Sequence, residues 1–170
     1  MSDTDARNAP VTADEAQEII DRWARLQDAQ APLEELLEIV AEEGFLLESP
    51  TADRRWEGRE GLRAHQELMR VFFDAEHHFR DVRIAPGAER TIAWTCLSWQ
   101  ARYRPAGSPT SSVVKAYMEH EWELRRCERS GRPFLARLTV DRFEYRKGCA
   151  PAQAVAGNPY LDPGLPVQSR

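Results

Sequence analysis

The segment Ser112–Leu124, S-V-V-K-A-Y-M-E-H-E-W-E-L, alternates with a period of two residues and therefore predicts a β-strand. One face of this strand is mostly charged, and the other carries Val114, Ala116, Met118, His120, Trp122 and Leu124. The second face is apolar except for an imidazole and an indole. Such a face is typical of a sheet that curves around a pocket, because a strand that only covers a core has no use for a titratable ring. The alternative is that His120 is a buried histidine bonded to a backbone carbonyl.

Three further strands are predicted around this one. From residue 76 onward, β-branched and aromatic residues alternate with polar ones, and Pro86-Gly87 and Ser130-Gly131-Arg132-Pro133 supply turns. Long consecutive strands joined by hairpins indicate an antiparallel sheet. The predicted strands span residues 77–85, 90–104, 112–127 and 134–146.

Strict alternation also assigns faces within two of these strands. It places His78 with Val82 and Ile84, and it turns the neighbouring His77 the other way, so the two histidines are poorly placed to bind one metal ion. The strand 90–104 is apolar on both faces. Its alternation therefore leaves open which face lines a cavity, and its tryptophans are candidates for an aromatic pocket or for ordinary core packing.

The first predicted helix begins at Thr12, which forms a T-x-x-E capping box with Glu15. Its apolar stripe includes Trp23 and ends near Asp28. Asp28 is consequently a candidate pocket acid, with an ordinary exposed carboxylate as the alternative.

Two more helices are expected. The second runs from Pro32 to a stop signal at Gly44, and the third covers residues 58–73. A short strand is expected between them at residues 45–47, followed by a charged loop. His65 interrupts the apolar stripe of the third helix, where it is either a catalytic residue or an ordinary histidine that is hydrogen-bonded or partly exposed.

Composition limits the classes of function. The 170 residues, 42% of them hydrophobic, are sufficient for one domain, and the net charge of −5 argues against broad binding to nucleic acid or an anionic membrane. Cys96, Cys127 and Cys149 fit neither a disulfide framework nor a C-x-x-C zinc site. With no leader and no membrane-spanning run in the sequence, we expect a soluble cytoplasmic protein with reduced thiols.

The predicted domain is flanked by two segments of different composition. Residues 1–11 are small and polar and are expected to form a flexible N-terminus, and residues 12–147 form the domain. Residues 148–170 are rich in Pro and Gly and predict a tail, with Tyr160 and Leu161 as its anchors on a neighbouring surface.

Over residues 12–147 the chain resembles the SnoaL-like branch of the nuclear transport factor 2-like superfamily. The resemblance rests on the order of the elements and on several short stretches, namely Trp23–Asp28 leading into L-x-x-L-L at residues 33–37, Gly58-Arg59-Glu60-Gly61-Leu62, and His78–Ile84. It implies a cone-shaped α+β fold in which three N-terminal helices pack on a curved antiparallel sheet. It also implies a deep, mostly apolar pocket and a homodimer formed through the sheet.

The resemblance does not imply one reaction, because the same fold is shared in this superfamily by isomerases, dehydratases, epoxide hydrolases, cyclases and non-catalytic binding domains. Our leading hypothesis is a cofactor-independent acid/base enzyme of isomerase, dehydratase or cyclase type that acts on an apolar or aromatic carbonyl compound. The sequence favours His120 as the base. The other candidate catalytic residues are Asp28, His78 and Asp141, and the candidate substrate-binding residues are Trp122, Trp99, Met118, His65 and Trp23.

A non-catalytic module for ligand binding or dimerisation is the second hypothesis. It rests on the predicted strand 90–104, which is apolar on both faces, and on the lack of a recognisable catalytic pair in the sequence. No cofactor or metal is expected, because the sequence has no G-x-G-x-x-G, no G-K-[ST] phosphate loop and no close cluster of histidines and acids.

Overall fold

The computed structural model describes residues 9–169, so most of the expected flexible N-terminus lies outside the described residues. The described part combines helices with one six-stranded sheet, which confirms the α+β class. The helices do not all precede the sheet, because the third helix follows two short strands. In chain order the elements are α2 (Ala13–Asp28), α3 (Leu33–Leu37), β1 (Leu46–Ser49), η1 (Pro50–Ala52), β2 (Arg54–Glu57), α4 (Gly58–Met69), β3 (Phe72–Ala85), β4 (Thr91–Tyr103), β5 (Ser112–Arg126) and β6 (Pro133–Tyr145).

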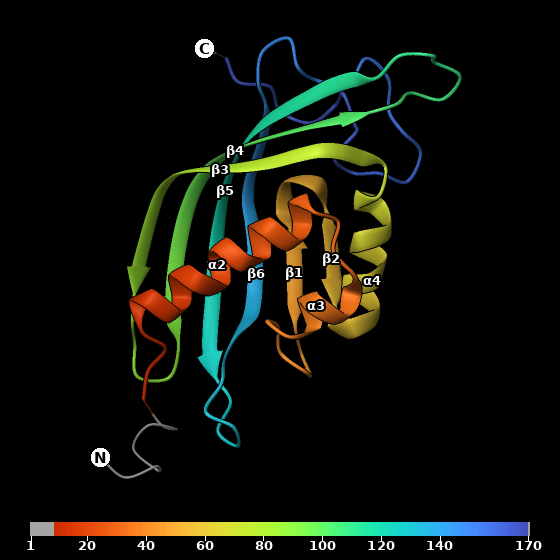
Figure 1. Ribbon diagram of the computed structural model, residues 1–170. Helices are drawn as coiled ribbons and strands as arrows, with labels where there is room; N and C mark the ends of the chain where they lie inside the picture. The colour runs from red at the N-terminus through yellow and green to blue at the C-terminus, as the bar shows by residue number, and fades with distance from the viewer. Residues whose placement is uncertain (1–8, 170) are drawn as a thin grey trace.

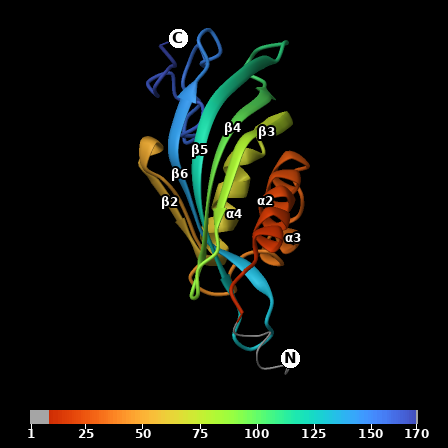
Figure 2. The same ribbon diagram turned by 90° about the vertical axis from the view of Figure 1, so that its left-hand side faces the viewer.

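The strands lie in the order β2-β1-β6-β5-β4-β3. Every neighbouring pair is antiparallel except β1 and β6, which are parallel. The four long strands curve, and α2 crosses their face diagonally (Figure 1). In the turned view α2 and α3 stand on one side of the sheet (Figure 2). The hydrophobic core fills the space between this face and the helices. None of the helices in residues 9–169 is long and apolar enough to cross a bilayer.

The start of α2 follows from its capping residues, as predicted. The Thr12 hydroxyl accepts a hydrogen bond from the Glu15 backbone N–H at 3.3 Å, and the Glu15 carboxylate accepts one from the Thr12 N–H at 2.9 Å. Ile20, Trp23 and Gln27 are buried along one side of the helix. With its start and its buried side fixed, the helix ends with Asp28 beside β3.

The strand β5 also matches its prediction. Its buried residues are Val114, Ala116, Met118, His120, Trp122 and Leu124. In β4 the buried face is the one with Trp99, and the opposite face exposes Trp94. The alternation of the sequence therefore placed His120 correctly on the inner face of the sheet.

The predicted extents of the other two helices are wrong. The second helix stops at Leu37, because Ile39 and Ala41 instead form backbone hydrogen bonds of 2.8 and 2.9 Å with Leu135 of β6. The third helix stops at Met69, and β3 begins at Phe72. Part of the expected charged loop is the strand β2, which pairs with β1.

The predicted faces of β3 are wrong because of a bulge. Phe79 pairs with Leu97 and Asp81 pairs with Cys96, so one residue between them is extra and the alternation reverses. As a result, Phe79 before the bulge and Val82 after it both pack on the core. His77 therefore faces inward, with its side chain 9% exposed, and His78 faces outward, with its side chain 60% exposed.

The segment after β6 folds back onto the domain. Tyr160 and Leu161 are buried, and the Tyr145 hydroxyl donates to the Tyr160 carbonyl at 2.8 Å. The Asn158 amide donates to the Leu68 carbonyl at the end of α4, also at 2.8 Å. These contacts bring Tyr160 to the inner face of the sheet, next to α4.

We predict that Gly61→Ala destabilises the protein. A Cβ at this position would lie 2.6 Å from the carbonyl carbon of Trp56, where α4 packs against β2. The overpacking costs about 1–3 kcal/mol, which exceeds the gain of about 1 kcal/mol in helix propensity. Urea unfolding measures the difference in the free energy of unfolding.

Glu60→Ala in the same helix turn is the matched control for Gly61→Ala. Its side chain is exposed and forms only a surface ion pair with Arg63, so the free energy of unfolding should change by no more than about 0.5 kcal/mol. A Gly61→Ala protein as stable as the wild type would contradict the close packing of α4 on β2.

Candidate active site

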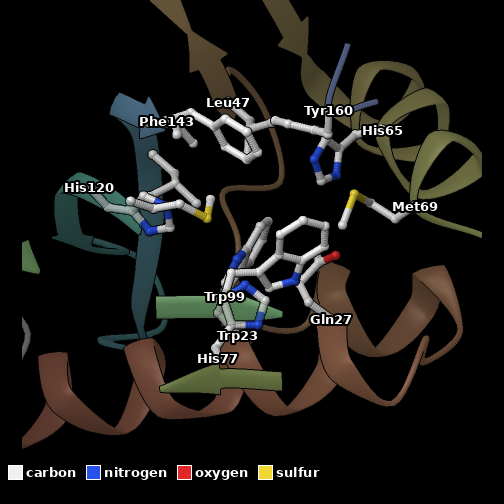
Figure 3. A pocket seen from close by; sticks show the side chains of 13 residues that line it. Trp23, Gln27, Leu47, His65, Met69, His77, Trp99, His120, Phe143 and Tyr160 are labelled. Atoms are coloured by element: carbon white, nitrogen blue, oxygen red, sulfur yellow. The ribbon is translucent and has the colours of Figure 1, made fainter. Parts of the chain in front are cut away.

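A cavity of about 40 Å³ lies between α2, α4 and the inner face of the sheet. Its walls are mainly aromatic and apolar, and three histidines interrupt them (Figure 3). The lining residues are Trp23, Gln27, Leu47, His65, Met69, His77, Trp99, Met118, His120, Leu138, Val140, Phe143 and Tyr160. A cavity of about 150 Å³ accommodates benzene, so a ring-sized ligand requires side chains to move. Met69 and Met118 are the most adaptable parts of the wall.

Asp28 and His77 form a close pair at the edge of this cavity. The distance from His77 Nδ1 to Asp28 Oδ1 is 2.6 Å, and the His77 backbone N–H donates to Asp28 Oδ2 at 3.0 Å. The last residue of α2 is thereby fixed to β3 through both carboxylate oxygens. The pair is mostly shielded from solvent, since the Asp28 side chain is 25% exposed and that of His77 is 9% exposed.

This geometry determines which ring nitrogen of His77 is free to react. An ionised carboxylate only accepts hydrogen bonds, so Nδ1 carries the proton and Nε2 keeps its lone pair. Asp28 thus orients the ring and can stabilise the imidazolium that forms when Nε2 takes up a proton. The pair is arranged to act as a general base toward a molecule in the cavity.

His120 lines the same cavity but differs from His77 in its surroundings. The residue is 4% exposed, and neither ring nitrogen has a hydrogen-bond partner among the described residues. Burial lowers the pKa of His120 to about 3, and repulsion between the two imidazolium rings when His77 is also protonated adds to the same shift. A histidine this weakly basic is neutral at physiological pH and is a poor proton acceptor. The backbone carbonyl partner considered for His120 is not found in residues 9–169.

His65 is the third histidine of the cavity. Its ring meets Trp56 edge-on with centroids 4.9 Å apart, and burial lowers its pKa to about 4. Buried nitrogens without a partner occur on four lining residues: Gln27 Nε2, His65 Nδ1, Trp99 Nε1 and both ring nitrogens of His120. Buried polar groups are normally hydrogen-bonded, so this concentration indicates that the cavity accommodates a polar ligand or solvent.

The structure brings together some of the predicted site residues. Trp23, His65, Trp99, Met118 and His120 all line the cavity, and Asp28 adjoins it through His77. Trp122, a predicted substrate-binding residue, does not line the cavity, because its ring is fully buried in the core and its Nε1 donates to Thr95 Oγ1 at 3.0 Å. The roles of the residues that do line the cavity remain predictions.

Two predicted catalytic residues lie outside the cavity. His78 is on the outer face, where its Nε2 is 2.9 Å from Glu76 Oε2, because the bulge in β3 reverses the expected alternation. Asp141 is also exposed on the outer face, at a second bulge between β5 and β6. Partial burial and the neighbouring Glu121 and Glu119 raise the pKa of Asp141. This shift therefore arises on the outer face and is unrelated to the cavity.

Sequence reasoning missed His77, Gln27 and Tyr160 as site residues. Gln27 lies on the buried stripe of α2 directly before Asp28, so the helical periodicity of the sequence was sufficient to identify it as a candidate. His77 could be found only with knowledge of the bulge. Within residues 9–169, no group of three or more His, Cys, Asp or Glu residues is placed to hold a metal ion.

Comparison with known proteins supports the fold. No protein-family model and no curated protein matches this sequence. A proposed aromatic ring hydroxylase from Novosphingobium aromaticivorans is 12% identical with a TM-score of 0.64, and the match covers 85% of this chain and 96% of that chain. The hexachlorocyclohexane dehydrochlorinase LinA-type3 from Novosphingobium barchaimii is 12% identical with a TM-score of 0.62, covering 78% and 88% of the two chains.

A proposed scytalone dehydratase from Novosphingobium aromaticivorans is 14% identical with a TM-score of 0.60, and the match covers 76% of this chain and 80% of that chain. The expected resemblance to the nuclear transport factor 2-like superfamily, with its SnoaL-like members, is confirmed at the level of the fold. The names of these proteins describe different reactions, and identities this low show the fold alone.

We predict that His120 makes the protein less stable in mild acid. The unfolded state protonates this histidine near pH 6.5, whereas the folded state resists protonation down to a pKa of about 3. The unfolded state therefore binds more protons in this interval, and stability falls as the pH falls. The loss due to His120 is about 1.4 kcal/mol per pH unit below pH 6.

Urea unfolding at pH 6, 5.5 and 5 measures this dependence. His120→Gln should reduce the slope of stability against pH by about one proton, while Met118→Leu, which alters the same wall without a titrating group, should keep the wild-type slope. Equal slopes for His120→Gln and the wild type would show that the imidazole is protonated in the folded protein.

Proposed function

We propose that the protein is a cofactor-independent enzyme of lyase type, with dehydration or a related elimination or isomerisation as its reaction. Its substrate is a small, largely apolar or aromatic carbonyl compound. The observation that carries this proposal is the Asp28–His77 pair at the edge of an otherwise apolar cavity. The names of two proteins with this fold, a dehydrochlorinase and a proposed scytalone dehydratase, agree with an elimination reaction.

In this proposal His77 replaces His120 as the base. The lone pair on His77 Nε2 takes a proton from the carbon atom next to the substrate carbonyl, and the electron pair of that C–H bond is delocalised into an enolate. The enolate then expels the β leaving group and forms the new double bond; a halide leaves as the anion, and a hydroxyl leaves as water with the proton that His77 has taken up. Asp28 stabilises the positive charge that remains on the ring. His120, with its pKa lowered to about 3, stays neutral and is better suited to hydrogen bonding with the substrate.

The walls of the cavity support this chemistry. Trp23, Trp99 and Phe143 provide flat apolar surfaces against which a ring can stack. Because such walls exclude water, the ion pair formed during proton transfer is stabilised mainly by the nearby carboxylate. A base that contributes in this way typically accelerates a reaction by about 10²–10⁴-fold.

We predict that His77→Gln abolishes proton abstraction. The assay incubates a panel of β-hydroxy and β-halo aryl ketones with the protein in D₂O and follows deuterium incorporation and product formation by NMR. His77→Gln should lower the rate at least about 100-fold. Asp28→Asn should also be strongly impaired, because an amide no longer holds the ring in the productive tautomer.

The neighbouring His78→Gln is the matched control, because His78 faces solvent on the same strand. It should keep the wild-type rate. A His77→Gln protein with the wild-type rate would remove this residue from the mechanism. If ring compounds bind and none of the panel exchanges or reacts, the protein is instead a non-catalytic ligand-binding module.

A further inference from the structure

The indole N–H of Trp99 is a buried donor with nothing in the described chain to receive its hydrogen bond. Trp99 is 2% exposed, and its Nε1 has no partner in residues 9–169. Two tryptophans outside the cavity differ, since Trp94 donates to Glu121 and Trp122 donates to Thr95, each at 3.0 Å. An indole N–H can only donate, so Trp99 calls for an acceptor atom on a ligand.

Trp99 is also the direct cross-strand neighbour of the proposed base. His77 on β3 and Trp99 on β4 are paired in the sheet, and both side chains line the cavity (Figure 3). Directly paired residues have Cβ atoms about 4.5–5.5 Å apart. The two side chains therefore start from adjacent points of the sheet and enter the same cavity.

His120 is less well placed for this position. It pairs with Thr95, which lies four residues from Trp99 along β4. Four residues of a strand correspond to about 13 Å. In the sheet, Trp99 is thus directly paired with the base, whereas His120 starts from a backbone position further away; among the described residues, Gln27 Nε2, directly before Asp28 in α2, is a second unpartnered donor of the cavity.

The charge of the cavity further restricts the ligand. Within residues 9–169, no lysine or arginine lines the cavity, and most of the wall is apolar or aromatic. A ligand that is anionic on entry would lose its hydration without gaining a cationic partner. The site consequently favours a neutral molecule whose negative charge develops only during the reaction.

We propose that the Trp99 N–H stabilises the oxyanion formed when His77 removes a proton next to a carbonyl group. This inference rests on the proposed function and extends it by assigning Trp99 a catalytic role and by restricting the substrate to uncharged carbonyl compounds. The C–H bond breaks, the proton moves to His77 Nε2, and the electron pair is delocalised onto the carbonyl oxygen. That oxygen, now part of an enolate, accepts the hydrogen bond from Trp99 Nε1.

Phenols test the inference, because a phenolate resembles an enolate in carrying negative charge on an oxygen bound to an sp² carbon. The ¹⁵N-labelled wild-type protein is titrated with a series of ring-substituted phenols of increasing acidity, all neutral at the pH of the titration, so that negative charge forms on the oxygen only as the phenol passes its proton to His77 Nε2. Toluene serves as the ring without an oxygen. The indole N–H signal of Trp99, assigned with Trp99→Phe, should move further downfield as the acidity of the phenol increases. The signals of Trp94 and Trp122, which have protein partners, should stay in place.

Trp99→Phe keeps an aromatic ring at this position and removes only the donor. It should weaken binding of the most acidic phenol about 10- to 100-fold, with toluene affinity changed less than about two-fold. It should also lower the rate of proton abstraction about 100-fold, the usual effect of removing one oxyanion donor. Trp94→Phe, which alters an exposed indole, is the matched control and should change none of these quantities.

The outcomes separate this inference from the proposed function. A Trp99→Phe protein with wild-type phenol selectivity, in a background where His77→Gln abolishes exchange, overturns the role of Trp99 and leaves the base in place. Conversely, a Trp99 signal that follows phenol acidity supports the donor role even if His77→Gln retains activity. Failure of every phenol to bind overturns the inference. If Trp99→Phe does not fold, the phenol titration of the wild-type protein alone tests the donor role: an indole N–H signal that does not follow phenol acidity overturns it.

Discussion

The contact between Asp28 and His77 is the interaction on which the site depends. It joins the last residue of α2 to the edge strand β3 through two hydrogen bonds, one to the ring and one to the backbone. Just beyond the helix, the Gln30 side chain adds a hydrogen bond to the Phe72 carbonyl at the start of β3. Because one carboxylate both fixes the backbone of β3 and orients the ring of His77, the geometry of the fold and the placement of the proposed base are set together.

The three histidines of the cavity show how environment divides similar side chains into different roles. His65 and His120 are buried without an acidic partner, so burial lowers the pKa of each well below 6.5 and both stay neutral. His77 alone has a carboxylate against its ring. An imidazole with such a partner can hold the positive charge that follows proton transfer, whereas an imidazole among apolar side chains cannot. The partner therefore decides which histidine is suited to be the base.

Much of the fold could be predicted from the sequence, because local rules and tertiary structure agree there. The capping box at Thr12 and the alternation of β5 both depend on neighbouring residues, and both were confirmed. The faces of β3 and the length of α3 could not be predicted in this way. One is set by a bulge in the pairing with β4, and the other by hydrogen bonds between Ile39–Ala41 and Leu135, nearly 100 residues later in the chain.

The same limitation explains the errors in the predicted site. Every candidate on α2, α4, β4 and β5 except Trp122 reached the cavity or its edge, because regular periodicity holds in those elements. His78 and Asp141 were misplaced at the two bulges, where a single extra residue exchanges inside and outside. A bulge next to an active site re-aims side chains. Here the bulge makes the apolar positions Val82 and Ile84 appear to share a face with His78, so the sequence pattern does not reveal that His77 faces the cavity.

The unpartnered nitrogens of the cavity link function to stability. A buried polar group without a hydrogen bond costs about 1–3 kcal/mol, and a folded domain has only about 5–15 kcal/mol of net stability. Five such atoms on Gln27, His65, Trp99 and His120 are therefore a substantial burden unless molecules inside the cavity form hydrogen bonds with them. An apolar core of the same volume would fold more stably, so these residues are better explained by recognition of a ligand than by packing. Because a ligand that satisfies them binds the folded state alone, its binding free energy adds to the stability of the fold.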